Sequence, residues 1–125
     1  MNKILLTGST GFIGAELLKK LSNKNIIFIT LRKKNNIYSN NKNIKKIYFD
    51  NYKKLNNSLK KISVDFVIHC ATHYVKQHKH DDLKKLSDSN ILFGNIILEN
   101  LDIMKVKKFI NFSTVWENYD AKKDN

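Results

Sequence analysis

Three of the four glycines in this sequence lie within eight residues, Thr7–Gly14 (TGSTGFIG). The preceding run, residues 3–7, is apolar and short, which is typical of a buried strand. After the glycines, Leu17, Leu18 and Leu21 recur at helical spacing. We therefore expect a tight turn between a first strand and a first helix, and this turn restricts the folds open to the chain.

The rest of the sequence continues to alternate between strand and helix patterns. Four further apolar runs predict strands, at residues 26–31, 44–49, 65–71 and 108–113. The longest helical pattern spans residues 81–101 and has Asn90 on its apolar face, whereas Lys33–Asn43 has the composition of an exposed connection. This alternation predicts a parallel sheet in a doubly wound, Rossmann-type α/β domain over residues 1–125, ending after about the fifth strand.

Each glycine of the turn has a physical role in binding a dinucleotide. Gly8 makes the turn, Gly11 lets the backbone approach a pyrophosphate, and Gly14 lets the helix approach the strand. The start of the helix adds unpaired N–H groups and a positive dipole. The alternative is a tight turn without a ligand. The predicted cofactor loop consists of Gly8, Ser9, Thr10, Gly11, Phe12, Ile13 and Gly14.

The pattern Thr-Gly-x-x-Gly-x-x-Gly resembles the cofactor loop of short-chain dehydrogenases/reductases, particularly the extended group of sugar-nucleotide epimerases, dehydratases and reductases. Three later segments fit this resemblance in order and spacing, namely residues 69–73 (HCATH), 90–94 (NILFG) and 109–114 (FINFST). Residues 71–75 (ATHYV), together with residues 90–94, look most like CDP-deoxyhexose reductases. The resemblance implies the NAD(P)-binding portion of an enzyme that transfers hydride to or from a nucleotide-linked sugar.

Cofactor preference in such folds depends on the end of the second strand, where an acidic residue favours NAD and a cation favours NADP. No acidic residue is present there. Arg32, the only arginine, occupies the position, and a guanidinium can bind a phosphate in a fork geometry. We predict NADP, with NAD as the alternative cofactor and a solvated Arg32 beside Lys33 and Lys34 as the alternative structure.

The resemblance also implies roles for residues at the ends of the third and fourth strands. Asp50 matches the acidic residue that accepts a hydrogen bond from the adenine amine, although it can also be a turn residue. Ala71 and Thr72 match the positions beside the ribose and nicotinamide of the cofactor. All three are therefore predicted to bind the cofactor.

Three further residues are predicted, by the same resemblance, to belong to the catalytic site. Asn90 matches an asparagine that organises the proton relay, and its alternative is an amide bonded to nearby backbone. Thr114 matches the catalytic serine or threonine that orients the substrate oxygen, with Ser113 as second choice. A strand that simply turns at Ser-Thr is the alternative for both.

The family also requires a Tyr-x-x-x-Lys helix, whose tyrosine serves as general acid or base. Tyr119 and Lys123 have this spacing, but they follow Thr114 too closely for a loop and a new helix to intervene. We interpret the match as coincidence. The expectation is a chain that lacks the catalytic tyrosine and lysine, the remaining strands and the C-terminal substrate domain, and is not catalytically complete.

Composition restricts the remaining functions. The net charge of +12 raises the possibility of a basic nucleic-acid binder, but the lysines are scattered over every segment and indicate a solvated surface, so no nucleic-acid partner is expected.

Histidine spacing predicts no metal site. Without an apolar run of membrane-spanning length or a signal peptide, the chain is expected to be cytoplasmic, with no membrane partner. An alternative function is a non-catalytic NADP-binding module that acts with a partner. A homo-oligomer is also possible.

Overall fold

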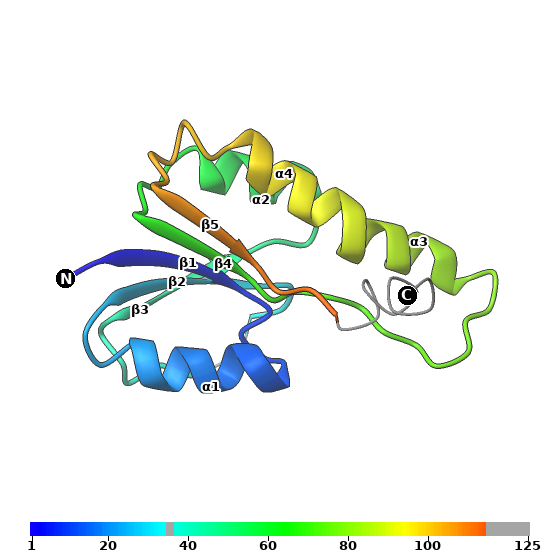
Figure 1. Cartoon of the computed structure of the whole chain (residues 1–125), viewed down its shortest axis with the longest axis horizontal. Coiled ribbons are helices and arrows are strands. Elements are labelled where there is room, and N and C mark those ends of the chain that lie inside the picture. Colours follow the sequence, from blue (N-terminus) through cyan, green and yellow to red (C-terminus); the bar gives the residue numbers. More distant parts are fainter. Residues whose placement is uncertain (35–36, 115–125) are drawn as a thin grey trace, which may run out of the picture.

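Five parallel strands form one sheet in the computed structural model, which describes residues 1–34 and 37–114 (Figure 1). The strand order is β3-β2-β1-β4-β5, and every neighbouring pair is parallel. The strands are β1 (Lys3–Thr7), β2 (Ile26–Leu31), β3 (Ile44–Tyr48), β4 (Phe66–His69) and β5 (Lys108–Asn111). The predicted Rossmann-type fold is confirmed.

Helices cover both faces of the sheet, as Figure 1 shows. Helix α1 (Phe12–Leu21) lies on one face, and α2 (Tyr52–Leu59) and α4 (Phe93–Glu99) lie on the other. Successive residues of β1 point to opposite faces. Leu6 therefore packs in the core on the α1 side, and Leu5 packs in the core beneath α2 and α4.

The predicted helix over residues 81–101 is interrupted by one wide turn. It consists of α3 (Asp82–Ser87), the π-helical turn η1 (Asp88–Leu92) and α4, and in η1 the Phe93 N–H donates to the carbonyl of Asp88, five residues earlier. The wide turn shifts the buried face, so Ser89 is buried and Asn90 is exposed. The expectation that Asn90 lies on the apolar face was therefore wrong.

The strand order reverses between β1 and β4. From β1 the chain runs outward through β2 and β3, then returns to β4 on the other side of β1. The loops after β1 and β4 therefore leave the sheet in opposite directions, which opens a crevice at their carboxyl ends.

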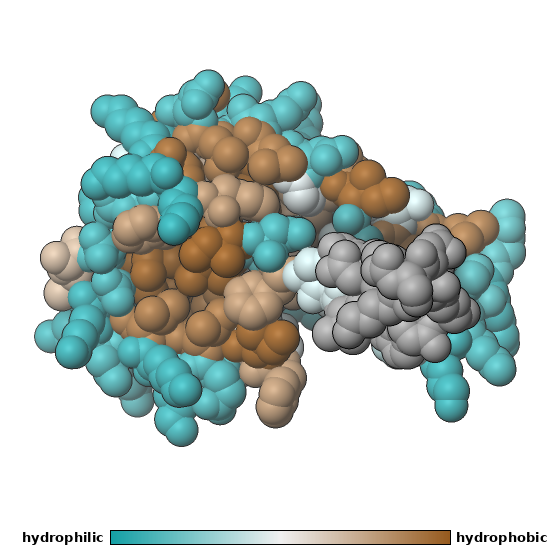
Figure 2. Space-filling model, viewed as in Figure 1, coloured by the Kyte–Doolittle hydropathy of each residue, from teal (hydrophilic) through white to brown (hydrophobic). Residues whose placement is uncertain are grey.

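The β5 side of the sheet presents apolar surface. Within the described residues β5 pairs only with β4, and its Ile110 and the following Phe112 are exposed. Figure 2 shows apolar side chains gathered over the strands between α4 and α1 on this side, with hydrophilic residues around them.

Candidate cofactor site

A cleft of about 850 Å³ lies at the carboxyl ends of β1, β2 and β4, where the strand order reverses. This volume is in the range of pockets that hold small molecules and cofactors. Six of the seven predicted loop residues line it, namely Gly8, Thr10, Gly11, Phe12, Ile13 and Gly14. Ser9 is buried and does not line the cleft, and its hydroxyl has no hydrogen-bond partner among the described residues.

Packing within the protein explains two of the three glycines. Gly8 has φ +70°, and a Cβ there would lie 2.7 Å from the backbone nitrogen of Ala71. A Cβ at Gly14 would lie 2.0 Å from the carbonyl oxygen of Gly8. At Gly11 the closest atom is that same oxygen, at 3.3 Å, which a small shift relieves. The space above Gly11 belongs to the cleft, so a glycine at this position suits a ligand that approaches the backbone closely.

The start of α1 opens into the same cleft without a side-chain cap. Among the described residues no side chain caps the helix, and its first turn contains no acidic residue. The first N–H groups of a helix have no partner within the helix, and the dipole makes this end positive. Because Phe12 and Ile13 line the cleft, these groups can bind an anion such as a pyrophosphate.

Arg32 lies where β2 ends and lines the cleft, as the sequence predicted for a cofactor-binding cation. Its Nη2 donates to the Tyr52 hydroxyl and to Ser89 Oγ, each at 2.9 Å. The guanidinium carbon lies 5.7 Å from the centre of the Phe49 ring and 5.8 Å from that of Tyr52. Arg32 is exposed, and these contacts hold its guanidinium in place. Its role in binding a cofactor stays a prediction.

Asp50 is not among the residues that line the cleft. Its carboxylate accepts hydrogen bonds from Lys54 Nζ at 2.8 Å and from Asn51 Nδ2 at 2.9 Å. The hydrogen bond from Lys54 holds the pKa of Asp50 below its usual value. The structure therefore places Asp50 as a strand-end residue paired with α2, and contact with an adenine stays a prediction.

Asn90 holds the loop that follows β4. Its carboxamide oxygen accepts from the Thr72 hydroxyl at 3.1 Å and from the His73 N–H at 2.7 Å, while its amide nitrogen donates to the His73 carbonyl at 2.9 Å. Ala71, Thr72 and His73 all line the cleft, so the structure brings the predicted residues of this loop to one wall. Asn90 bonds to nearby backbone, and its predicted role in a proton relay is untested.

A buried pair of side chains supports this wall from below. Thr7 Oγ1 lies 2.7 Å from Nδ1 of His69, its register partner on β4, and it also accepts from the Ala71 N–H at 3.1 Å. His69 packs edge-on against Phe93, with ring centres 5.4 Å apart. Burial lowers the pKa of His69, which favours the neutral ring.

The depressed pKa of His69 predicts a loss of stability in mild acid. In the unfolded chain His69 takes up a proton near pH 6.5, before the folded chain does, so stability is retained above this pH and falls as the pH drops below it. The slope is at most about 1.4 kcal/mol per pH unit. Urea unfolding between pH 8 and 5 measures it. A His69→Asn variant keeps an acceptor for Thr7, and an unchanged slope in it would contradict the assignment.

The predicted catalytic hydroxyls do not line this cleft. Ser113 and Thr114 follow β5, both are exposed, and Ser113 Oγ accepts from the Thr114 N–H at 2.6 Å. Tyr119 and Lys123, interpreted above as a coincidental match, lie outside the described residues. The described cleft thus contains the predicted cofactor loop but neither of the predicted catalytic hydroxyls.

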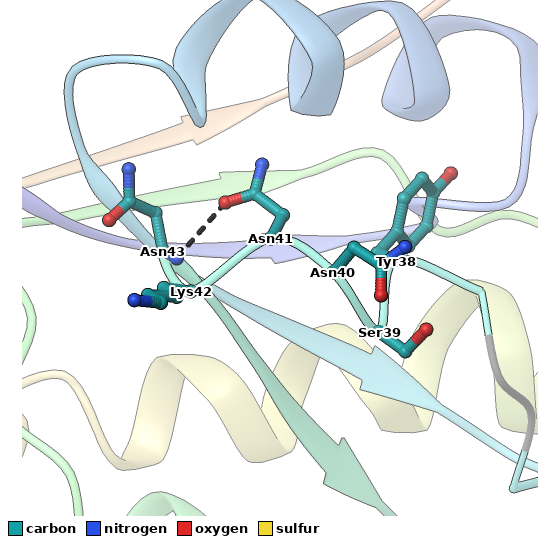
Figure 3. A pocket seen from close by; sticks show the side chains of 6 residues that line it. All are labelled: Tyr38, Ser39, Asn40, Asn41, Lys42 and Asn43. Atoms are coloured by element: carbon teal, nitrogen blue, oxygen red, sulfur yellow. Dashed lines mark hydrogen bonds between the residues drawn. The ribbon is translucent and has the colours of Figure 1, made fainter.

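A second hollow, lined by residues 38–43, belongs to the connection between β2 and β3 (Figure 3). The Asn43 N–H donates to Asn41 Oδ1 at 3.0 Å, and Asn43 Nδ2 donates to the Ser22 carbonyl at 2.7 Å. The bond to Ser22 ties the connection to the end of α1. Because the lining comes from a single polar loop, we assign it no chemistry.

Within residues 1–34 and 37–114, no group of three His, Cys, Asp or Glu side chains could hold a metal ion. No helix in those ranges is long and apolar enough to cross a membrane.

The sequence interpretation did not predict that the long helix contributes to the cleft, which it does through Lys85, Ser89 and Phe93. They recur at intervals of four, which places them on one helical face. This spacing is the only feature of the sequence that could have linked the three residues. Apolar periodicity alone does not identify a lysine and a serine as neighbours of a cleft.

Two known proteins are similar to this chain over most of its length. A dTDP-D-glucose 4,6-dehydratase of Dictyostelium discoideum is 34% identical over 91% of this chain and 29% of its own length. A UDP-glucuronic acid 4-epimerase of Bacillus cereus, solved with NAD and a UDP-linked sugar analogue, is 27% identical with a TM-score of 0.72, over 90% of this chain and 40% of its own. The chain thus spans less than half the length of either protein.

A short-chain dehydrogenase of Leptospira borgpetersenii, solved with bound NAD⁺, shares the fold with a TM-score of 0.75 at 18% identity, over 94% of this chain and 53% of its own. The model of the NAD dependent epimerase/dehydratase family matches residues 4–124. On this match over nearly the whole sequence, the chain belongs to the NAD dependent epimerase/dehydratase family.

Proposed function

We propose that this chain is the cofactor-binding portion of an enzyme that acts on nucleotide-linked sugars, and that it prefers NADP. The observation that carries the proposal is the cleft itself, where the glycine turn and the uncapped start of α1 face Arg32. The chemistry that the cofactor supplies when bound is hydride transfer. The substrate class rests on the dehydratase and epimerase relatives.

The residues present fit such a cofactor. The open space above Gly11 and the start of α1 would hold the pyrophosphate, and Arg32 would bind the 2′-phosphate. Ala71 and Thr72 would lie beside the nicotinamide ribose, on the wall that Asn90 holds. Ser113 and Thr114 would belong to the catalytic site of the whole enzyme, where one of their hydroxyls would orient the substrate oxygen.

Cofactor preference is supported by the charges around the cleft. Arg32, Lys33 and Lys85 line it, and no aspartate or glutamate does so in the described part of the chain. An acidic residue at the end of β2 would bind the ribose hydroxyls of NAD, whereas cations there stabilise a 2′-phosphate. These observations favour NADP over NAD.

Calorimetric titration of the 125-residue chain with NADPH and NADH tests the proposal. We expect tighter binding of NADPH, and a loss of about tenfold or more in NADPH affinity in Arg32→Ala, because a charged hydrogen-bonded contact is removed. NADH affinity should change little. Lys34→Ala is the matched control, since Lys34 is exposed and does not line the cleft. Tighter binding of NADH, or an Arg32→Ala variant that binds like the parent, would reject the NADP preference.

A non-catalytic NADP-binding module is the second candidate. It is favoured by one observation, that Ser113 and Thr114 do not line the described cleft. Both candidates predict cofactor binding, and turnover of a nucleotide-linked sugar by the chain would exclude the non-catalytic module. A cytoplasmic location and a homo-oligomer stay predictions for either candidate.

A further inference from the structure

Three cations reach the cleft from two separate parts of the chain. Arg32 and Lys33 follow β2, whereas Lys85 belongs to α3, more than fifty residues later in the sequence. No carboxylate lines the cleft within the described ranges, so these positive charges are not neutralised there. The wall formed by the long helix is therefore positive as well.

Lys85 differs from its neighbour Lys84 in its surroundings. Lys84 Nζ forms an ion pair with Asp88 at 2.6 Å and does not line the cleft. Lys85 lines the cleft, and within residues 1–34 and 37–114 its ammonium group has no ion pair or hydrogen bond. Two adjacent lysines on one short helix thus have separate surroundings, and only Lys85 is available to a ligand in the cleft.

The next turn of the same helix connects Lys85 to Arg32. Ser89, four residues after Lys85, lies on the same helical face and accepts a hydrogen bond from Arg32 Nη2 at 2.9 Å. The Tyr52 hydroxyl accepts from the same nitrogen and donates to the Asp88 carbonyl at 3.0 Å. Arg32 is thereby bonded to the long helix at Ser89, one helical turn after Lys85, and both cations line the cleft.

We propose that Lys85 is a second cofactor-specificity residue, which binds the 2′-phosphate of NADP from the long helix while Arg32 binds it from the end of β2. The proposal rests on the NADP preference proposed above. Two cations on separate elements would surround a phosphate dianion, which a single cation at the end of a strand cannot do. Ser89 acts as a positioning residue, because it holds Arg32 toward this arrangement.

Calorimetry on the 125-residue chain tests this with NADPH and NADH, and with the fragments 2′,5′-ADP and 5′-ADP. Because Lys85 is exposed, Lys85→Ala should weaken NADPH and 2′,5′-ADP by about fivefold. NADH and 5′-ADP should change by less than about twofold in this variant. Charge reversal in Lys85→Glu should enlarge the NADPH loss, and Lys84→Ala should leave all four affinities within about twofold of the parent. Circular dichroism verifies folding in each variant.

The outcomes separate this inference from the proposed function. If Arg32→Ala loses NADPH affinity and Lys85→Glu does not, the NADP preference stands and the role of Lys85 is rejected. Equal losses of NADPH and NADH in the Lys85 variants also reject it, because the residue would then not distinguish the 2′-phosphate. If Arg32→Ala keeps full NADPH affinity, the NADP preference itself fails.

Discussion

Replacing Gly14 with alanine should lower the free energy of unfolding by about 3 kcal/mol or more. The added methyl carbon would lie 2.0 Å from the carbonyl oxygen of Gly8 and 2.6 Å from its carbonyl carbon. Both are backbone atoms, so no rotamer change removes the overlap and α1 must move away from the turn. Urea unfolding followed by circular dichroism measures the loss.

Gly11→Ala is the matched control, because it adds the same methyl group to the same turn. Its Cβ would lie 3.3 Å from the Gly8 carbonyl oxygen, so the stability loss should be below about 1 kcal/mol. The proposed pyrophosphate site predicts that this variant still loses cofactor affinity, since the methyl enters the cleft. If Gly14→Ala were as stable as Gly11→Ala, the close contact between α1 and the turn would be wrong.

Replacing Leu5 with alanine should cost about 3–4 kcal/mol of the free energy of unfolding. Leu5 is fully buried in the central strand β1, between β2 and β4, and belongs to the core cluster beneath α2 and α4. Strands on both sides prevent the neighbouring side chains from closing the cavity. Urea unfolding at neutral pH measures this loss, which is a large part of the 5–15 kcal/mol typical of a domain.

Leu98→Ala removes the same atoms from a different environment. Leu98 lies on α4 and is 48% exposed, so its loss should be about 1 kcal/mol or less. Equal losses at both positions would contradict the placement of Leu5 in the core. Thermal unfolding of the two variants at one pH provides an independent comparison.

Much of the fold was predictable from local patterns. The bounds of β1 and β2 agree with the predicted runs, because a strand buried on both faces consists of continuous apolar residues that end at a polar turn. The predicted strands at residues 65–71 and 108–113 extend two residues beyond the ends of β4 and β5. In the long helix, a regular 3.6-residue period wrongly placed Asn90 inside. The π turn η1 lengthens the repeat locally, and periodicity cannot reveal this.

The candidate site was also predictable only in part. Six of the seven predicted loop residues line the cleft because one strand-turn-helix unit places them all, and Arg32 reaches it because it directly follows β2. Asp50 illustrates the limit of such reasoning. It lies two residues beyond the end of β3 and does not close the strand as predicted. Its carboxylate pairs with Lys54, and this pairing depends on how α2 begins.

The alternation of elements, the glycine turn and the cation at the end of β2 could be predicted from local patterns, because each depends on residues adjacent in the chain. Other features required the fold: Lys85 lines the cleft with Arg32, Ser89 bonds to Arg32, Asn90 holds the loop after β4, and His69 pairs with Thr7. These contacts join segments between 17 and 62 positions apart. They form because the parallel sheet brings the carboxyl ends of its strands together, and no local pattern of residues encodes that meeting.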